Sequence, residues 1–115
     1  MSRFGDEESR KAWKKGKLDS NGYAPSILAT ENGFCYFCGR QTEVVRHEIF
    51  YGSLLRKVSK EQGTWCYLCV PCHQFEHQGG GLERDGMTLK QMAQTAFERN
   101  HTREEFMKLY GRNYL

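Results

Sequence analysis

The sequence predicts a small α+β domain that is organised around bound zinc and continues into C-terminal helices. Three observations predict this fold class. Two Cys-x-x-Cys pairs, Cys35/Cys38 and Cys69/Cys72, offer the four thiolates of a tetrahedral zinc site. Two short runs between the pairs are rich in β-branched and aromatic residues, which is typical of strands. In the C-terminal part of the chain, apolar residues recur at helical spacing.

The composition is that of one domain with a thin apolar core. The chain has 115 residues, of which 38% are hydrophobic, and its mean hydropathy is -0.75. Because zinc binding contributes directly to the free energy of folding, a structural zinc would compensate for a small core. No apolar run approaches the roughly 18 residues of a membrane-spanning helix, so we expect no membrane partner.

Cysteine usage and charge indicate the compartment and the class of partner. The first residues lack the apolar core of a secretory signal peptide, so we expect a cytoplasmic protein. In that compartment, the five cysteines favour metal ligation over disulfides. A net charge of +3 permits a nucleic-acid partner without requiring one.

We divide the chain into three parts. Residues 1–32 are predicted to form a polar and basic arm, residues 33–81 the zinc-bound core, and residues 82–115 a helical segment that packs on the core. The most basic run, 10–17, suits either contact with phosphates or a solvated tail. Residues 23–30 suit a short helix or an irregular lead-in to the core.

Inside the core, the pattern predicts two strands, a short helix between them and a helix after them. The strands are expected over 43–50 and 64–68, and the helical turns between them over 54–60. Pro71 suits the first turn of the second helix, and the glycines at 79–81 end it.

The C-terminal segment is predicted to contain two helices. Thr88 and Gln91 have the spacing of a capping box, as do Thr102 and Glu105, and Gly111 ends the second helix. The first helix carries an apolar stripe, which we expect to pack in the core, made of Leu89, Met92, Ala93, Ala96 and Phe97.

The four zinc ligands are predicted to be the two Cys-x-x-Cys pairs named above. Cys66 and Cys69 have the same spacing and form an alternative pair. We favour Cys69 and Cys72, because Pro71 and the start of a helix suit a knuckle there. Cys66 falls inside the second strand and is expected to act as a small buried hydrophobe.

The histidines indicate a second metal site. His73 and His77 lie four residues apart on a predicted helix, so their rings project from one face, about 5–6 Å apart at Cβ. His47 lies on the hairpin that precedes this helix, in the strand expected over 43–50. Three imidazoles tied to one zinc frame suit a divalent metal with hydrolytic chemistry.

The order Cys-x-x-Cys, then a strand with His-x-Ile, then Leu-Cys-x-x-Cys-His-x-x-x-His resembles the HNH endonucleases. It is most similar to the small HNH-type proteins of bacteriophages and prophages. The resemblance covers residues 35–77, and 98–115 also look like the tails of those proteins. It implies a treble-clef-like ββα-metal core, and a phage-encoded enzyme that hydrolyses DNA phosphodiester bonds in the cytoplasm of an infected or lysogenic bacterial host. The implied cofactors are a structural zinc and a second divalent metal, namely Mg, Mn, Ni or Zn.

The resemblance also implies roles for single residues. His47 takes the position of a metal ligand on the strand, Glu48 the position of the general base, and His73 and His77 those of the helix ligands. In the family the base is usually a histidine, and here it is Glu48. The family's middle asparagine has no counterpart, and Leu55 stands near its expected place.

Two assignments stay open at this point. Either Glu48 is the base, or His47 is the base and Glu48 or Glu76 joins the other histidines on the metal. The nearest cations for DNA phosphates are Arg46, Arg56, Lys57 and Lys60. The alternative function is a non-catalytic zinc-bound module that binds nucleic acid or a host or phage recombination or defence protein.

Overall fold

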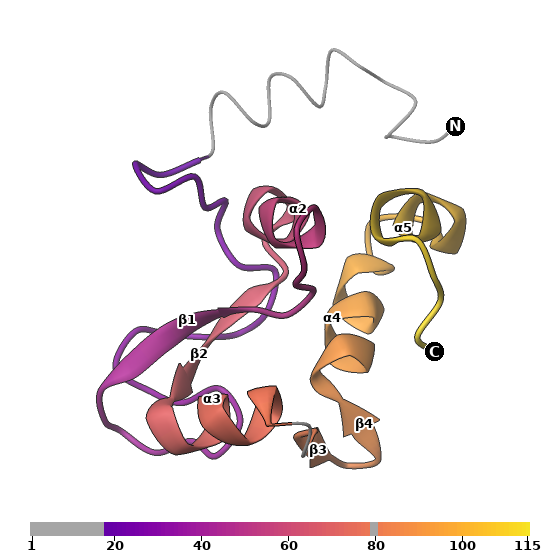
Figure 1. Cartoon of the computed structure of the whole chain (residues 1–115). Helices are drawn as coiled ribbons and strands as arrows, with labels where there is room; N and C mark the ends of the chain where they lie inside the picture. Colours follow the sequence, from indigo (N-terminus) through magenta and orange to yellow (C-terminus); the bar gives the residue numbers. More distant parts are fainter. Residues whose placement is uncertain (1–17, 79–80) are drawn as a thin grey trace.

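The computed structural model describes residues 18–78 and 81–115, so the basic run expected at 10–17 lies outside the described residues. Within those residues the chain is a compact α+β protein with two small antiparallel sheets and four helices, as the sequence predicts in outline. Figure 1 shows the larger sheet and one helix on one side of the molecule and the two C-terminal helices on the other. No helix of the described residues is long and apolar enough to cross a bilayer.

The larger sheet is a hairpin of β1 (Val44–Glu48) and β2 (Trp65–Cys69). Its antiparallel register places Val44 opposite Cys69 and Glu48 opposite Trp65. The sequence predicts a strand that continues to Phe50, but β1 ends at Glu48. Phe50 instead turns into the core, where its backbone N–H and C=O both bond the buried hydroxyl of Ser59. This side-chain pairing replaces the ladder bonds that a longer strand would make.

Two helices accompany the hairpin. The helix α2 (Leu55–Gln62) joins the two strands and ends at Gly63, whose φ of 78° gives a left-handed cap. The helix α3 (Val70–His77) follows β2 directly and has proline in its first turn, as expected. It packs against both strands of the hairpin. Because α3 begins at the residue after β2 ends, the start of this helix lies beside the end of the strand.

A second hairpin, which the sequence analysis did not predict, connects the core to the C-terminal helices. Its strands are β3 (Glu83–Arg84) and β4 (Met87–Thr88), joined by a two-residue turn in which Asp85 and Gly86 both have positive φ. The strands are two residues long, too short for an alternating pattern to be visible in the sequence.

The C-terminal helices are α4 (Leu89–Phe97) and α5 (Arg103–Tyr110). Both begin with the capping boxes that the sequence predicts, and α5 ends at Gly111 with a left-handed φ of 85°. The apolar stripe of α4 is confirmed as core packing: Leu89, Ala93, Ala96 and Phe97 are buried, and Met92 is partly buried against them.

An aromatic cluster joins these helices to the end of β1. The Phe50 ring lies 5.5 Å from that of Phe106, 4.4 Å from that of Tyr110 and 5.2 Å from that of Tyr114, between ring centroids. Phe50 and Phe106 are fully buried. Edge-to-face and tilted aromatic pairs at these distances stabilise beyond simple area burial, by about 0.5–1.5 kcal/mol each.

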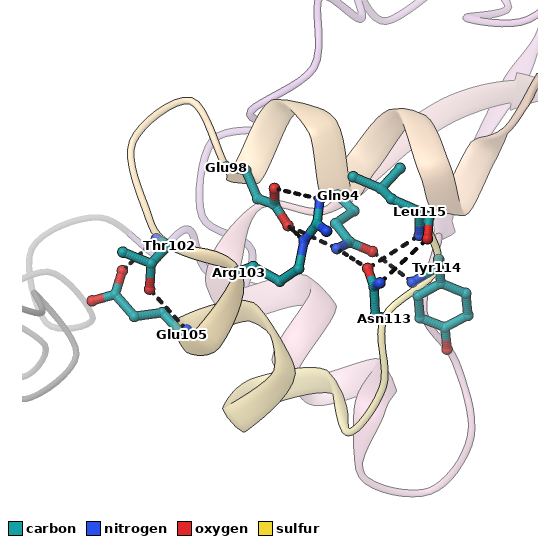
Figure 2. A network of polar contacts seen from close by, with 8 residues as sticks. All are labelled: Gln94, Glu98, Thr102, Arg103, Glu105, Asn113, Tyr114 and Leu115. Carbon is teal, nitrogen blue, oxygen red and sulfur yellow. Dashed lines mark hydrogen bonds and ion pairs between the residues drawn. The ribbon is translucent and has the colours of Figure 1, made fainter.

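A buried glutamine of α4 bonds the last residues of the chain, as Figure 2 shows. The Gln94 amide donates to Glu98 and to Asn113, each at 2.7 Å, and its oxygen accepts from the Tyr114 N–H at 2.8 Å. Arg103 adds an ion pair to Glu98 at 3.1 Å. Because the buried amide is satisfied at both ends, it stabilises one position of the C-terminal tail.

The segment expected at 23–30 as a short helix or an irregular lead-in is irregular in the structure. It is fixed by backbone bonds instead: Ala24 N–H donates to the Lys60 carbonyl, and Ile27 N–H to the Gly63 carbonyl. The indole N–H of Trp65 donates to the Ala24 carbonyl at 2.8 Å. These contacts place the lead-in against α2 and the hairpin.

Candidate metal centres

The four expected cysteines come together at the end of the hairpin. Their sulfurs all lie within 4.8 Å of one another, and those of Cys38 and Cys69 are 3.8 Å apart. Cys35 and Cys38 lie in a tight turn in which the Gly39 N–H donates to the Cys35 carbonyl. Cys69 ends β2, and Cys72 lies in the first turn of α3. This four-cysteine group can hold a metal ion such as zinc.

The surroundings of Cys35 and Cys72 shift the pKa values of these two thiols in opposite directions. Burial raises the pKa of Cys35, but backbone N–H groups of Cys38, Cys69 and Phe37 face its sulfur and hold the pKa at about 6. Burial and the neighbouring sulfurs raise the pKa of Cys72. A divalent cation among the sulfurs would favour their ionised forms, which is how metal binding couples to folding.

Cys66 stands apart from the cluster. It is fully buried, and burial raises the pKa of its thiol far above the ordinary value. The cluster therefore uses the pair Cys69/Cys72, and Cys66 packs in the apolar core as expected.

Arg84 on β3 holds the first cysteine turn in place. Its guanidinium donates to the carbonyls of Tyr36 at 3.0 Å and Phe37 at 2.6 Å. It also lies 5.3 Å and 5.4 Å from the centroids of the same two rings. The sequence analysis missed this residue. A single arginine belongs to no sequence pattern, and the turn that Arg84 contacts lies more than 40 residues earlier in the chain.

The three expected histidines also come together. His47 on β1 and His73 and His77 on α3 place one ring nitrogen each within 4.8 Å of the others. The Nε2 atoms of His73 and His77 are 3.1 Å apart. Tyr51 lines the same cluster, with its ring 5.1 Å from that of His77 and 6.0 Å from that of His47. Tyr51 was not predicted as part of the site.

His47 is the buried member of this cluster. It is 1% exposed, and its Nε2 has no hydrogen-bond partner among residues 18–78 and 81–115. Burial first, and then the charges of His73, His77 and Lys90, lower its pKa to about 3. The imidazole is therefore neutral near pH 7, which is the form that binds a metal ion.

His73 is more exposed than His47, and its pKa responds to the charge of a carboxylate. Burial and the charge of His77 lower its pKa, and the charge of Glu48 partly opposes the shift. Glu48 therefore lies near enough to the histidine cluster to act on it electrostatically.

The Glu48 carboxylate is held by two residues. The Tyr23 hydroxyl donates to Oε2 in a short hydrogen bond, and the Arg56 Nε lies 3.7 Å from Oε1. Burial, followed by this contact with Glu48, raises the pKa of Tyr23 to about 12, so the hydroxyl keeps its proton. Tyr23 was not predicted as a site residue, since it lies in the irregular lead-in far from the motifs.

The four candidate phosphate-binding cations do not form one group. Arg46 is paired with Asp19 at 3.0 Å and lies over the rings of Tyr23 and Trp65, at 4.3 Å and 4.9 Å from their centroids. The other three line one hollow of about 400 Å³ beside α2, namely Arg56, Lys57 and Lys60.

Comparison of this chain with protein-family models, with curated proteins and with solved structures finds no match.

Proposed function

We propose that this protein is a metal-dependent HNH-type endonuclease with a ββα-metal core, acting on phosphodiester bonds of DNA. One observation carries the proposal: His47 is buried with an Nε2 that has no partner among the described residues, and it belongs to a cluster in which one ring nitrogen each of His47, His73 and His77 lie within 4.8 Å of one another. An unsatisfied buried polar atom costs about 1–3 kcal/mol, which a bound cation relieves.

The donor set fits a divalent metal. Imidazole nitrogens suit Zn, Ni and related ions, and three ligands leave positions open for water and substrate. When bound, the metal stabilises negative charge that develops on phosphate oxygens. The adjacent residues Cys72 and His73 tie this site to the four-cysteine site, so zinc at the cysteines would fix the position of α3.

Glu48 is our candidate for the general base. Its carboxylate would accept a proton from the water that attacks the phosphorus, while Tyr23 and Arg56 hold it in one orientation. In the alternative scheme, His47 is the base and Glu48 or Glu76 joins the other histidines on the metal. Of these two carboxylates, Glu76 accepts a hydrogen bond from the Leu82 N–H at 2.9 Å.

The hollow beside α2 is our candidate for contacts with the DNA backbone. Arg56 contributes both to this hollow and to the ion pair with Glu48. A strand whose phosphates lie along Arg56, Lys57 and Lys60 would thus pass close to Glu48. These cations contact phosphates and so position the strand without reading its sequence.

The same contacts also favour a second candidate function. Glu48 is bonded by Tyr23 and Arg56, as a purely structural carboxylate would be. The protein would then be a non-catalytic zinc-bound module that binds nucleic acid or a recombination or defence protein of the host or phage.

Metal analysis and cleavage assays separate the two. We expect the protein to cut plasmid or single-stranded DNA with Mg²⁺, Mn²⁺ or Ni²⁺, and His73→Ala to cut at least about 100-fold more slowly while keeping its zinc. Gln74→Ala, an exposed change on the same helix, is the control and should cut normally. Equal cleavage by His73→Ala would contradict the nuclease proposal. DNA binding without any cleavage would support the second function.

A further inference from the structure

Lys90, in the first turn of α4, lies beside the histidine cluster although it comes from the C-terminal segment. Its Nζ is 4.8 Å from the centroid of the Tyr51 ring. That ring in turn lies 5.1 Å from the His77 ring and 6.0 Å from the His47 ring. The tertiary structure thus adds a cation to a site whose other cations come from the core.

The position of Lys90 is unfavourable for a purely structural lysine. The N-terminal end of a helix carries partial positive charge, which disfavours a cation in the first turn. The first turn of α4 has no acidic residue to compensate. The side chain is half-buried, and among the described residues its ammonium makes ring contacts but no hydrogen bond or ion pair. Three donors are therefore available to a ligand.

The ammonium is nevertheless held in place. The Lys90 Nζ faces the Tyr51 ring and also lies 5.7 Å from the centroid of the Tyr114 ring. Gln91 donates to the Tyr114 carbonyl at 3.0 Å, and the Tyr114 N–H donates to Gln94 at 2.8 Å. Figure 2 shows the second of these bonds, within the network that fixes the tail on α4. Two tyrosine faces thus keep the cation near the histidines before any ligand binds.

We propose that Lys90 is a phosphate-binding residue of the histidine site, contacting a backbone phosphate of the bound nucleic-acid strand. This inference rests on the proposed function, because it takes the ligand to be a nucleic acid. It follows from the half-buried Lys90 side chain, from the approach of its ammonium to Tyr51, and from the His47 Nε2 in the same cluster. Neither the ammonium nor this Nε2 has a hydrogen-bond or ionic partner among residues 18–78 and 81–115. A lysine ammonium is a compact point charge that suits a phosphate oxygen.

Binding measurements test this contact without relying on cleavage. The probes are a short fluorescent DNA duplex and its single strand, titrated by anisotropy with the zinc-loaded protein and no second metal, over a range of salt. We expect Lys90→Gln to weaken binding about tenfold. A plot of the logarithm of the association constant against the logarithm of the salt concentration has a negative slope. The magnitude of this slope should decrease by about 0.9 for the duplex or about 0.7 for the single strand.

Two variants serve as controls. Lys90→Arg keeps the charge and should bind within about twofold of the unchanged protein. Lys108→Gln removes an exposed lysine from the last turn of α5 and should leave affinity and salt slope unchanged. Thermal melting of all three variants verifies that each is folded.

The inference is overturned if Lys90→Gln binds with the affinity and salt slope of Lys108→Gln, or if the unchanged protein binds neither probe. Cleavage that needs His73 would then leave the nuclease proposal standing without Lys90. Conversely, binding that depends on Lys90 without any cleavage that needs His73 would support the phosphate contact and reject the nuclease.

Discussion

His47 and Glu48 are neighbours on β1 but are held from different sides of the strand. His47 is buried on the face that meets α3 and its histidines. Glu48 shares the opposite face with Arg46, since side chains alternate along a strand. Tyr23 contacts both residues of that face, through its ring and its hydroxyl. The proposed metal ligand and the proposed base are thus neighbours in sequence that are held by separate sets of contacts.

Changing Glu48 to glutamine tests its assignment as the base. The amide keeps the size of the side chain and can still contact Tyr23, but it cannot accept a proton from water. We expect the cleavage rate to fall by about 10²–10⁴-fold while DNA binding persists. The measurements are single-turnover cleavage and anisotropy.

Glu43→Gln is the matched control, because Glu43 is exposed just before β1. It should cleave at the normal rate. Undiminished cleavage by Glu48→Gln would mean that Glu48 has a structural role, with His47 or a metal-bound hydroxide as the base.

At the scale of elements, the end of α2 and the irregular lead-in depend on one glycine. Gly63 caps α2 with a φ of 78°, and its carbonyl accepts a hydrogen bond from Ile27. A Cβ at this position would collide with the Pro25 carbonyl oxygen. Only glycine therefore satisfies both the cap and the close approach of the lead-in.

Gly63→Ala should destabilise the protein more than the same change at Gly86. Both glycines have a φ of 78°, so both variants carry the left-handed strain of about 1–2 kcal/mol. At Gly86 a Cβ would meet nothing within 4 Å, whereas at Gly63 the collision adds about 1–3 kcal/mol. Urea unfolding of the two zinc-loaded variants measures the difference. Equal losses would show that the lead-in moves aside freely.

A buried hydroxyl pair connects α5 to the start of β2. The Tyr110 and Thr64 hydroxyl oxygens are 2.9 Å apart, and both residues are buried. Burial raises the pKa of Tyr110 above its ordinary value of 10.0, although the bond to Thr64 opposes the shift. Because the folded pKa is the higher one, this contribution to stability is complete below pH 10 and is lost as the pH rises further.

Tyr110→Phe should therefore change the alkaline behaviour of the protein. At pH 7 we expect the variant to be about 1 kcal/mol less stable, since Thr64 loses its partner. Above pH 10 the difference should shrink and then reverse, because phenylalanine does not ionise. Urea midpoints of both proteins from pH 7 to pH 11 measure this. A constant difference in stability between the two proteins from pH 7 to pH 11 would contradict the raised pKa of Tyr110.

For the whole molecule, zinc is expected to decide whether the domain folds. The four cysteines join the first turn, the end of β2 and the start of α3. A structural zinc contributes about 10–16 kcal/mol of apparent binding free energy, whereas small domains are stable by only about 5–15 kcal/mol. Loss of the metal thus removes an amount comparable to the whole stability.

Cys69→Ser should lose zinc and unfold or precipitate, and a chelator should unfold the unchanged protein. Cys66→Ala is the control, since Cys66 is buried but lies outside the cluster, and it should cost only a small packing loss and keep the metal. Zinc content by elemental analysis and the melting temperature give the result. A Cys69→Ser protein with normal zinc and normal melting would reject the four-cysteine site.

Features with a local pattern could be predicted from the sequence. The paired cysteines, the histidines four residues apart on α3, both capping boxes and the apolar stripe of α4 all repeat at spacings of a few residues. Such spacings reflect the geometry of turns and helices, which the neighbouring residues themselves determine. The sequence alone therefore determined the α+β class, the helices and the residues that gather in the cysteine cluster and in the histidine cluster.

Only the tertiary structure decided how the rest of the chain completes those clusters. The contacts of Tyr23 with Glu48, of Arg84 with the carbonyls of Tyr36 and Phe37, and of Lys90 with Tyr51 join residues far apart in the chain. Tyrosine, arginine and lysine occur throughout the chain, and packing of the folded chain decides which of them makes such a contact. Packing of this kind produces no periodic pattern in the sequence. The identities of the clustered cysteines and histidines thus follow from local sequence, whereas the residues that hold and surround them depend on the folded chain.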